Sequence, residues 1–229
     1  MAIHIINQLQ DQDKALNNTL SYPNLEKTIS MVLGIGEFYE ACKDYPILFS
    51  KDKDGEWMAL ALMGYNDKNV YLDDTKRFKA GKYIPTLIRC YPFMLVQNEA
   101  QGNFSLAVDE SAIEPLTKTN KERALFKEDK TPSDFAKNTL DFLMNFQGGL
   151  QASNAFIKEL EAWQLLVEQS ANITDENGKV HTINGFFILN EEKFNHLSEA
   201  KKLEIFNKGA IPLISAHLIS LSNIRRLGL

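Results

Sequence analysis

The spacing of apolar residues changes near Thr131, and this change constrains the fold more than any other feature of the chain. Before it, apolar residues form short runs between turn-forming residues, such as 46–49 and 57–65 on either side of Asp54-Gly55. An Asp-Gly pair between two apolar runs is typical of a β-hairpin. After it, apolar residues recur on one face at helical spacing, beginning with Phe135. The sequence therefore predicts an α+β fold.

The N-terminal half is expected to be mainly antiparallel sheet. Short apolar runs predict an edge strand at 3–6 and a further strand at 69–72. A second hairpin is predicted from 92–97 and 103–108, which flank a polar loop at 98–102. The two short helices expected in this half are 37–43 and 84–90.

The C-terminal half is expected to hold long helices and one β-hairpin. Thr131 at the cap and Pro132 at the first helical position are start signals for a helix, whose apolar face continues to Val167. Gly148-Gly149 interrupts this face, which predicts a bend or two helices, and a hinge or close packing would explain retaining both glycines. Asn177-Gly178 predicts the hairpin. The remaining helices are expected at 191–196, 199–207 and 210–227.

The whole chain, 1–229, is expected to form a single domain. A length of 229 residues lies within the range of one domain and is sufficient to bury a sizeable core. Hydrophobic residues make up 44% and charged residues 24%, which is an ordinary globular composition. The charged segment near 114–130 is interpreted as a surface loop between the two halves.

The charge distribution argues against nucleic acid as a partner. The formal net charge is −5, and lysines and arginines occur singly or in pairs rather than in a basic patch with interleaved aromatic residues. No transmembrane segment is expected either, because the most apolar stretch, 210–227, is interrupted by a proline and four polar residues: Pro212, His217, Asn223, Arg225 and Arg226.

A cytoplasmic location is expected, although surface association stays open. The first ten residues lack a basic region followed by an apolar run, so no signal peptide is visible. Cys42 and Cys90 lie far apart, which fits reduced thiols better than a disulfide framework.

Two short motifs only partly match known ligand loops. Gly34-Ile35-Gly36 begins like a dinucleotide loop, but Tyr39 stands where the third glycine should be. Ser50, Asp52, Asp54 and Gly55 imitate the first half of a calcium loop, yet Ala61 replaces the closing glutamate, so a hairpin turn explains them better.

The four histidines show none of the spacings typical of metal sites. His217 falls on the apolar face of the last helix, which predicts a core histidine with a hydrogen bond. A metal site assembled from distant residues stays open, with His181 and His217 among its candidate ligands. We assign no catalytic, metal-binding or cofactor-binding residue, expect no cofactor, and favour a protein that is not an enzyme.

Two segments that contain a Tyr-Pro pair differ from these motifs. Tyr45 precedes a proline and an apolar strand, and Tyr91 does the same after Arg89 and before Phe93. The bias against helix before proline explains both phrases structurally. Tyr and Arg are also favoured at protein interfaces, so Tyr45, Arg89, Tyr91 and Phe93 are the candidate residues of a groove for a peptide or protein partner.

These phrases also carry a family resemblance. From about residue 36 to 227, the chain resembles the SapC family of bacterial proteins in the order and spacing of four segments: DYPILF at 44–49, YIPTLIRCYPF at 83–93, GFFILNE at 185–191 and HLISLSN at 217–223. The resemblance implies no catalytic residues, because the family has no agreed biochemical activity. The family takes its name from a surface-layer locus, and its genes are associated with TonB-dependent receptors, flavin-dependent halogenases and cupin-like oxygenases.

Three functional hypotheses follow from the residues and the resemblance. The leading one is a non-catalytic binding or accessory protein for a peptide or protein partner linked to envelope, uptake or peptide and halogenation systems. The second is a metal-dependent enzyme acting on peptides, with ligands dispersed in sequence. The third is a structural component of the surface layer.

Overall fold

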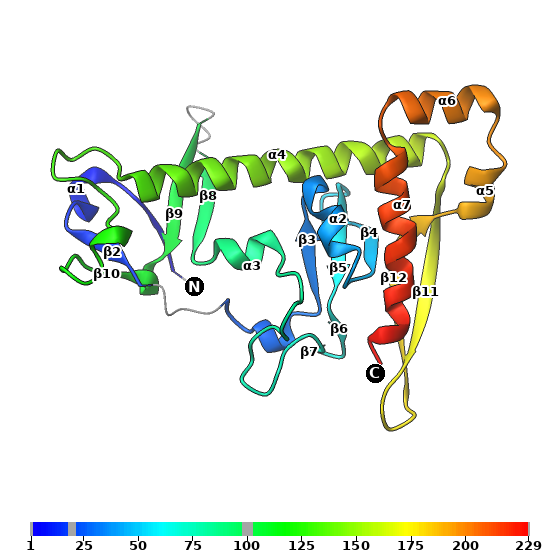
Figure 1. Ribbon diagram of the computed structural model, residues 1–229, viewed down its shortest axis with the longest axis horizontal. Coiled ribbons are helices and arrows are strands. Elements are labelled where there is room, and N and C mark those ends of the chain that lie inside the picture. The colour runs from blue at the N-terminus through cyan, green and yellow to red at the C-terminus, as the bar shows by residue number, and fades with distance from the viewer. Residues whose placement is uncertain (1, 18–21, 98–102, 229) are drawn as a thin grey trace. The chain divides into compact units, whose positions relative to one another are not determined.

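The computed structural model describes residues 2–17, 22–97 and 103–228 (Figure 1). Helices and antiparallel strands are both present, and the helices lie mostly in the C-terminal half. The predicted α+β fold is therefore confirmed. The predicted loop at 98–102 lies outside the described residues.

The chain divides into two compact units, each made of two separate segments. The first unit is Met1–Pro23 with Ile88–Gln147, and the second is Asn24–Leu87 with Gly148–Leu229. The segment 114–130 lies inside the first unit. Because neither unit is a continuous stretch of chain, the single-domain organisation stays a prediction.

The first unit is built on two small antiparallel sheets. One sheet has the order β1-β9-β8 and the other pairs β10 with β2. Their strands are β1 (Ile3–Ile5), β8 (Phe93–Gln97), β9 (Phe104–Asp109), β2 (Lys14–Leu16) and β10 (Ile113–Pro115). The predicted edge strand and the second hairpin are confirmed, since β1 pairs only with β9 among the described residues and β8 pairs with β9.

The core of the first unit joins these sheets to a helix. Phe93, Leu106, Val108 and Leu125 are buried there together with Leu143 from the long helix α4 (Asp134–Ala162). The shorter helical elements that contribute residues to this unit are α1 (Gln8–Asp11), α3 (Thr86–Cys90), η3 (Glu110–Ala112) and η4 (Lys121–Arg123).

Helix α4 starts two residues later than the sequence predicts. Ser133 acts as its cap, because its hydroxyl accepts a hydrogen bond from the Ala136 amide at 3.1 Å. Thr131 belongs to the preceding turn, where its amide and hydroxyl both donate to the carboxylate of Asp129, at 3.0 and 2.6 Å. The prediction of Thr131 as cap and Pro132 as first helical residue is therefore wrong.

The two glycines do not divide α4, which is continuous from Asp134 to Ala162. Gly149 lies against a neighbouring segment, since a Cβ atom there would lie 3.4 Å from the Cα of Gly34, which is an ordinary van der Waals contact. Gly148 faces open space instead, because a Cβ atom there would meet no atom of a neighbouring element within 4 Å. Val167, predicted on the helical face, belongs to the next strand.

Replacing Gly148 with alanine is expected to raise the free energy of unfolding by about 1 kcal/mol, because alanine is the better helix former and meets no neighbour. Gly149→Ala should gain less, since its methyl group approaches the Gly34 backbone. Urea denaturation of both variants measures the difference. A loss of stability in Gly148→Ala would contradict the rigid helix and favour a hinge.

The second unit contains a five-stranded antiparallel sheet with the order β11-β12-β4-β5-β3. Its strands are β3 (Ser30–Leu33), β4 (Ile47–Lys51), β5 (Trp57–Leu62), β11 (Leu166–Thr174) and β12 (Val180–Leu189). Both predicted hairpins of this sheet are confirmed. Asp52 forms the first turn by accepting from the amides of Asp54 and Glu56, and Gly178 supplies the left-handed residue of the second with φ +78°.

Helices cover this sheet, and Figure 1 shows α7 (Ile211–Ser220) lying along β12. His217 of α7 is 1% exposed and its ring stacks on Phe49 of β4 at 4.4 Å. The predicted core histidine is confirmed, since its Nε2 accepts a hydrogen bond from the Leu189 amide at 3.0 Å. The remaining helical elements are α2 (Phe38–Ala41), α5 (Glu191–Asn195), α6 (Glu199–Asn207), η1 (Leu25–Lys27), η2 (Ile35–Glu37) and η5 (Leu221–Arg226).

A two-residue hairpin replaces the strand predicted at 69–72. It pairs β6 (Gly64–Tyr65) with β7 (Lys68–Asn69). The observed strand therefore ends at Asn69, the residue at which the predicted strand begins. Asn69 ends the strand because its side-chain oxygen accepts from the Tyr71 amide at 3.0 Å, which turns the chain.

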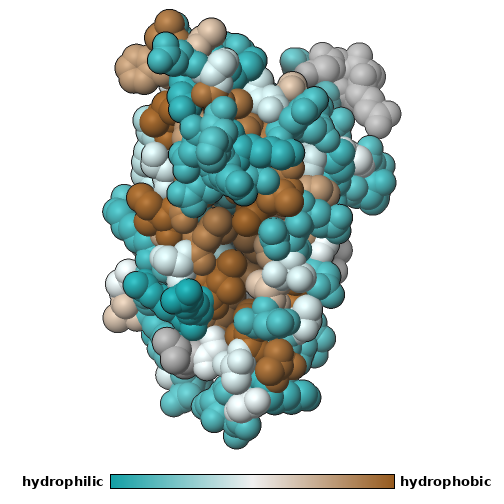
Figure 2. Space-filling view, turned by 90° about the vertical axis from the view of Figure 1, so that its right-hand side faces the viewer, coloured by the Kyte–Doolittle hydropathy of each residue, from teal (hydrophilic) through white to brown (hydrophobic). Residues whose placement is uncertain are grey.

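Apolar surface remains exposed on the second unit. Hydrophobic surface is gathered in the middle of the face shown in Figure 2, with hydrophilic surface around it. Exposed apolar side chains include Leu203 and Phe206 of α6 and Ile219 of α7. Nothing within the described ranges shows what would cover them, so we assign no site to them.

No helix in the described part of the chain has both the length and the apolar character that crossing a bilayer requires.

Candidate functional site

Three of the four predicted contact residues lie in one pocket of the first unit. Arg89, Tyr91 and Phe93 line a hollow of about 410 Å³, which we call the arginine pocket. Its other lining residues are Leu16, Asn17, Cys90, Pro92, Arg123, Phe135, Asn138, Thr139, Phe142 and Leu143.

Tyr45 belongs to the core of the second unit instead. Its side chain is fully buried, and its hydroxyl donates a hydrogen bond to the carbonyl of Tyr83. Its ring lies 4.5 Å from that of Tyr71, and burial raises the pKa of Tyr45. A buried side chain offers no surface to a partner, so Tyr45 is left out of the site proposed below.

The arginine pocket is assembled by local chain geometry. Helix α3 ends at Cys90 and β8 begins at Phe93, so the chain between them passes along one wall. Helix α4 contributes further lining residues, at 135, 138, 139 and 142, which follow helical spacing and therefore lie on one face of the helix. Arg123 enters from η4.

Aromatic rings form the apolar walls of the pocket. The rings of Phe93 and Phe135 meet edge to face, with their centroids 5.7 Å apart. Phe142 is 43% exposed, and the Arg89 guanidinium carbon lies 5.8 Å from its ring centroid. A guanidinium at this distance from an aromatic face makes a cation–π contact. Arginine and aromatic side chains are thus presented together.

Arg123 contributes a second positive charge, and its Nε donor has no hydrogen-bond acceptor among the described residues. Its side chain is 19% exposed, and Nε lies 3.5 Å from the carboxylate of Glu122. The Nε atom itself is buried and makes no hydrogen bond to any residue that the structure describes. Because this atom is enclosed by protein, an incoming acceptor would have to meet the exposed part of the side chain instead.

Tyr91 is held in place by a carboxylate beside the pocket. Its hydroxyl donates to Asp109 at 2.9 Å, and its ring meets Tyr22 edge to face at 5.8 Å. Burial and this hydrogen bond raise the pKa of Tyr91. Asp109 in turn accepts from the amide and hydroxyl of Ser111, and the hydroxyl contact lowers the pKa of Asp109. Tyr91 therefore remains a neutral, fixed wall.

The charge of the lining is positive. Two arginines line the arginine pocket, and none of its lining residues is Asp or Glu. The chain as a whole carries a net charge of −5. Positive charge in a hollow with apolar walls attracts anions more strongly than the same charge on an open surface.

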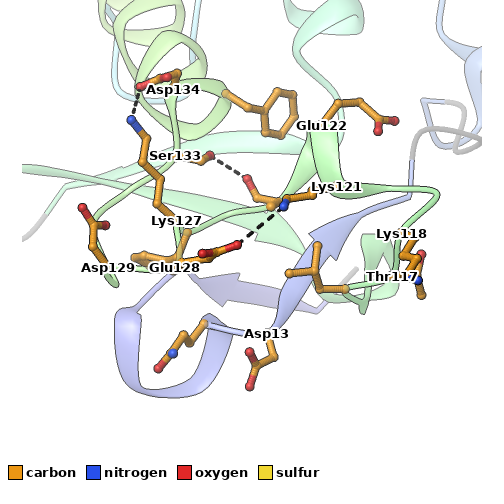
Figure 3. Close-up of a pocket in the computed structure, with 15 residues that line it drawn as sticks. Asp13, Thr117, Lys118, Lys121, Glu122, Lys127, Glu128, Asp129, Ser133 and Asp134 are labelled. Atoms are coloured by element: carbon orange, nitrogen blue, oxygen red, sulfur yellow. Dashed lines mark hydrogen bonds and ion pairs between the residues drawn. The ribbon is translucent and has the colours of Figure 1, made fainter.

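A larger hollow on the same unit has the opposite balance. This acidic pocket, of about 900 Å³, shares Phe135 with the arginine pocket and is lined by three lysines and five carboxylates. Figure 3 shows the Lys127 amine directed at Asp134, at 2.7 Å, and Lys121 directed at Glu128, at 3.5 Å. With two of its lysines paired in this way, the acidic pocket is a poor place for an anion.

The described residues contain no group of three or more His, Cys, Asp or Glu side chains placed to hold a metal ion. His181, one candidate ligand, bonds Asp175 at 2.8 Å and Asn66 at 2.6 Å. The partial dinucleotide motif also has a structural role, because the Gly34 amide donates to the carboxylate of Glu37 at 2.8 Å.

Sequence reasoning missed the part of the pocket that α4 and η4 supply. Phe135 and Phe142 were both visible as members of one apolar face, and their spacing of seven residues could have identified them as neighbours. Arg123 carries no comparable signal, since it stands in an irregular charged segment.

The comparisons with known proteins identify a family and nothing closer. No curated protein and no solved structure gives a significant match to the chain. The family model of SapC matches residues 6–227, which is nearly the full length. The chain therefore belongs to the SapC family, as its sequence resemblance predicted.

Proposed function

We propose that this protein is a non-catalytic binding or accessory protein that engages a peptide or protein partner through the arginine pocket. The observation that carries the proposal is the joint presentation of Arg89 and the half-exposed ring of Phe142, which form a cation–π pair at the pocket. Arginine and aromatic side chains dominate binding energy at protein interfaces.

The size of the pocket supports a segment rather than a folded surface as the contact. A volume of about 410 Å³ lies in the lower part of the range for small-ligand sites, which accommodates one or two side chains. A protruding peptide end or loop would enter it. The link of this partner to envelope, uptake or halogenation systems, and the cytoplasmic location, stay predictions.

Phe142→Ala is expected to reduce capture of the partner about tenfold or more, because loss of a central aromatic contact costs about 1–2 kcal/mol or more. The measurement is quantitative co-purification of the tagged full-length chain from its own cells. Met144→Ala is the matched control, since Met144 is 41% exposed on the same helix and does not line the pocket.

Thermal unfolding of both variants separates binding from stability. Both side chains are exposed, so each variant should unfold within a few degrees of the unchanged protein. Equal capture by Phe142→Ala and Met144→Ala would show that the arginine pocket is not the contact surface.

A further inference from the structure

We infer that the arginine pocket binds the C-terminal carboxylate of a peptide whose last side chain is apolar. The inference rests on the proposed function and adds the chemistry of the bound segment. The bound group is the end of a peptide chain, where a main-chain carboxylate and an apolar side chain are attached to the same carbon atom.

The charge of the lining favours an anion. Arg89 and Arg123 both line the pocket and no lining residue is acidic, although Glu122, outside the lining, lies 3.5 Å from the Arg123 Nε. The guanidinium group matches a carboxylate geometrically, because parallel N–H donors meet two oxygens. The Nε of Arg123 is enclosed by the protein, so such an oxygen would meet the solvent-accessible part of this side chain.

The walls require an apolar group next to the anion. Phe93 and Phe135 meet edge to face at 5.7 Å, and Pro92 and Leu143 add further apolar lining. Phe142 leaves 43% of its surface exposed at the same place. An inorganic anion would leave these walls in contact with water, whereas an apolar terminal residue would cover them.

A peptide main chain also fits the polar lining. Asn138 is exposed and offers both an amide donor and a carbonyl acceptor. The hydroxyl of Thr139 already donates to the Phe135 carbonyl at 2.8 Å, which leaves its oxygen as an acceptor for a peptide N–H. The terminal residue therefore meets partners for its carboxylate, its side chain and its main chain.

The neighbouring acidic pocket gives the peptide a direction. It shares Phe135 with the arginine pocket, and its five carboxylates outnumber its three lysines. A carboxylate is repelled there and attracted on the arginine side. The chain end therefore lies in the arginine pocket, and the residues before it cross Phe135 toward the acidic pocket.

The test is fluorescence anisotropy with the full-length protein. The probe is a fluorescein-labelled pentapeptide ending in Leu-Phe with a free carboxylate, compared with the same peptide amidated at its C-terminus. Amidation should weaken binding about tenfold or more, because a charge-assisted hydrogen bond to arginine contributes about 1.5–3 kcal/mol.

Variants locate the carboxylate. Arg123→Lys keeps the positive charge but replaces the planar guanidinium with an ammonium group, which cannot donate two parallel hydrogen bonds, and it should lose most of the preference for the free carboxylate over the amide. Arg89→Gln, at an exposed position, tests the second arginine without disturbing the core. Lys137→Gln is the control, because Lys137 is exposed on the same helix and lines neither pocket.

Each contrary outcome overturns the inference in a recognisable way. Equal binding of the free and amidated peptides would disprove carboxylate recognition. If Phe142→Ala then bound neither peptide, the proposed function would still stand. Displacement of the probe by inorganic phosphate, but not by N-acetylphenylalanine, would indicate a phosphate site instead. If neither peptide binds, the inference is wrong, and the capture experiment with Phe142→Ala decides the proposed function separately.

Discussion

Replacing Glu37 with alanine is expected to lower the free energy of unfolding by about 3–4 kcal/mol. The Glu37 side chain is buried and accepts three hydrogen bonds, from the Gly34 amide, the Tyr83 hydroxyl and the Thr86 amide, at 2.8, 2.8 and 2.7 Å. Alanine would leave these donors without this acceptor, and each buried unsatisfied donor costs about 1–3 kcal/mol. This buried carboxylate thus joins three separate positions of the second unit.

Urea denaturation of Glu37→Ala against Glu40→Ala measures the effect. Glu40 lies in the neighbouring turn of helix, its side chain is 58% exposed, and it pairs only with the exposed Lys43 among the described residues. An exposed pair of this kind contributes at most about 0.5 kcal/mol. If the two variants lose equal stability, the three hydrogen bonds of Glu37 do not stabilise the unit.

The second large expected effect is a loss of stability in acid that depends on His217. Burial lowers the pKa of His217 from 6.5 to about 4. Below pH 6.5 the unfolded chain binds a proton at this position, whereas the folded chain does not until about pH 4. The contribution of His217 is therefore complete above pH 6.5 and is lost as the pH falls toward 4.

Between pH 7 and pH 5 this histidine should cost about 2 kcal/mol of unfolding free energy. His217→Gln removes the titration and can still accept from the Leu189 amide, so its stability should vary less over this interval. His196→Gln, at an exposed histidine, is the control and should keep the full dependence on pH. A His217→Gln curve parallel to the unchanged protein between pH 5 and 7 would contradict the account.

The hairpins of the fold could be predicted because their signals are local. Asp54-Gly55 and Asn177-Gly178 each stand between apolar runs, and both turns occur where these residues place them. The start of α4 could not be fixed in the same way. Thr131 and Ser133 are both suitable caps by residue type, and only the folded structure shows that Thr131 joins the turn at Asp129 while Ser133 accepts from the helix.

The continuity of α4 through both glycines could not be predicted from the sequence. The Gly148-Gly149 pair weakens helix propensity locally, which favours a break. In the structure Gly149 allows the backbone of Gly34 to approach, and residues 115 positions apart in sequence cannot be matched by periodicity. Tertiary packing therefore overrides the local preference here.

Three residues of the candidate site followed from the same local reasoning. Arg89, Tyr91 and Phe93 are close in sequence, and the end of α3 and the start of β8 keep them close in space. Tyr45 shares their Tyr-Pro phrase but is fully buried, because the phrase marks a helix end and not a surface. Arg123 enters the pocket only through tertiary folding.

The most direct test of the account is to observe the arginine side chains during binding. In a ¹⁵N-labelled sample of the full-length protein, the Nε–H signal of Arg123 should shift on adding the peptide with a free carboxylate, and Arg89 should shift with it. The amidated peptide should leave the Arg123 signal in place. Shifts confined to residues of the acidic pocket or of the second unit, with both arginine signals unchanged, would contradict the central claim.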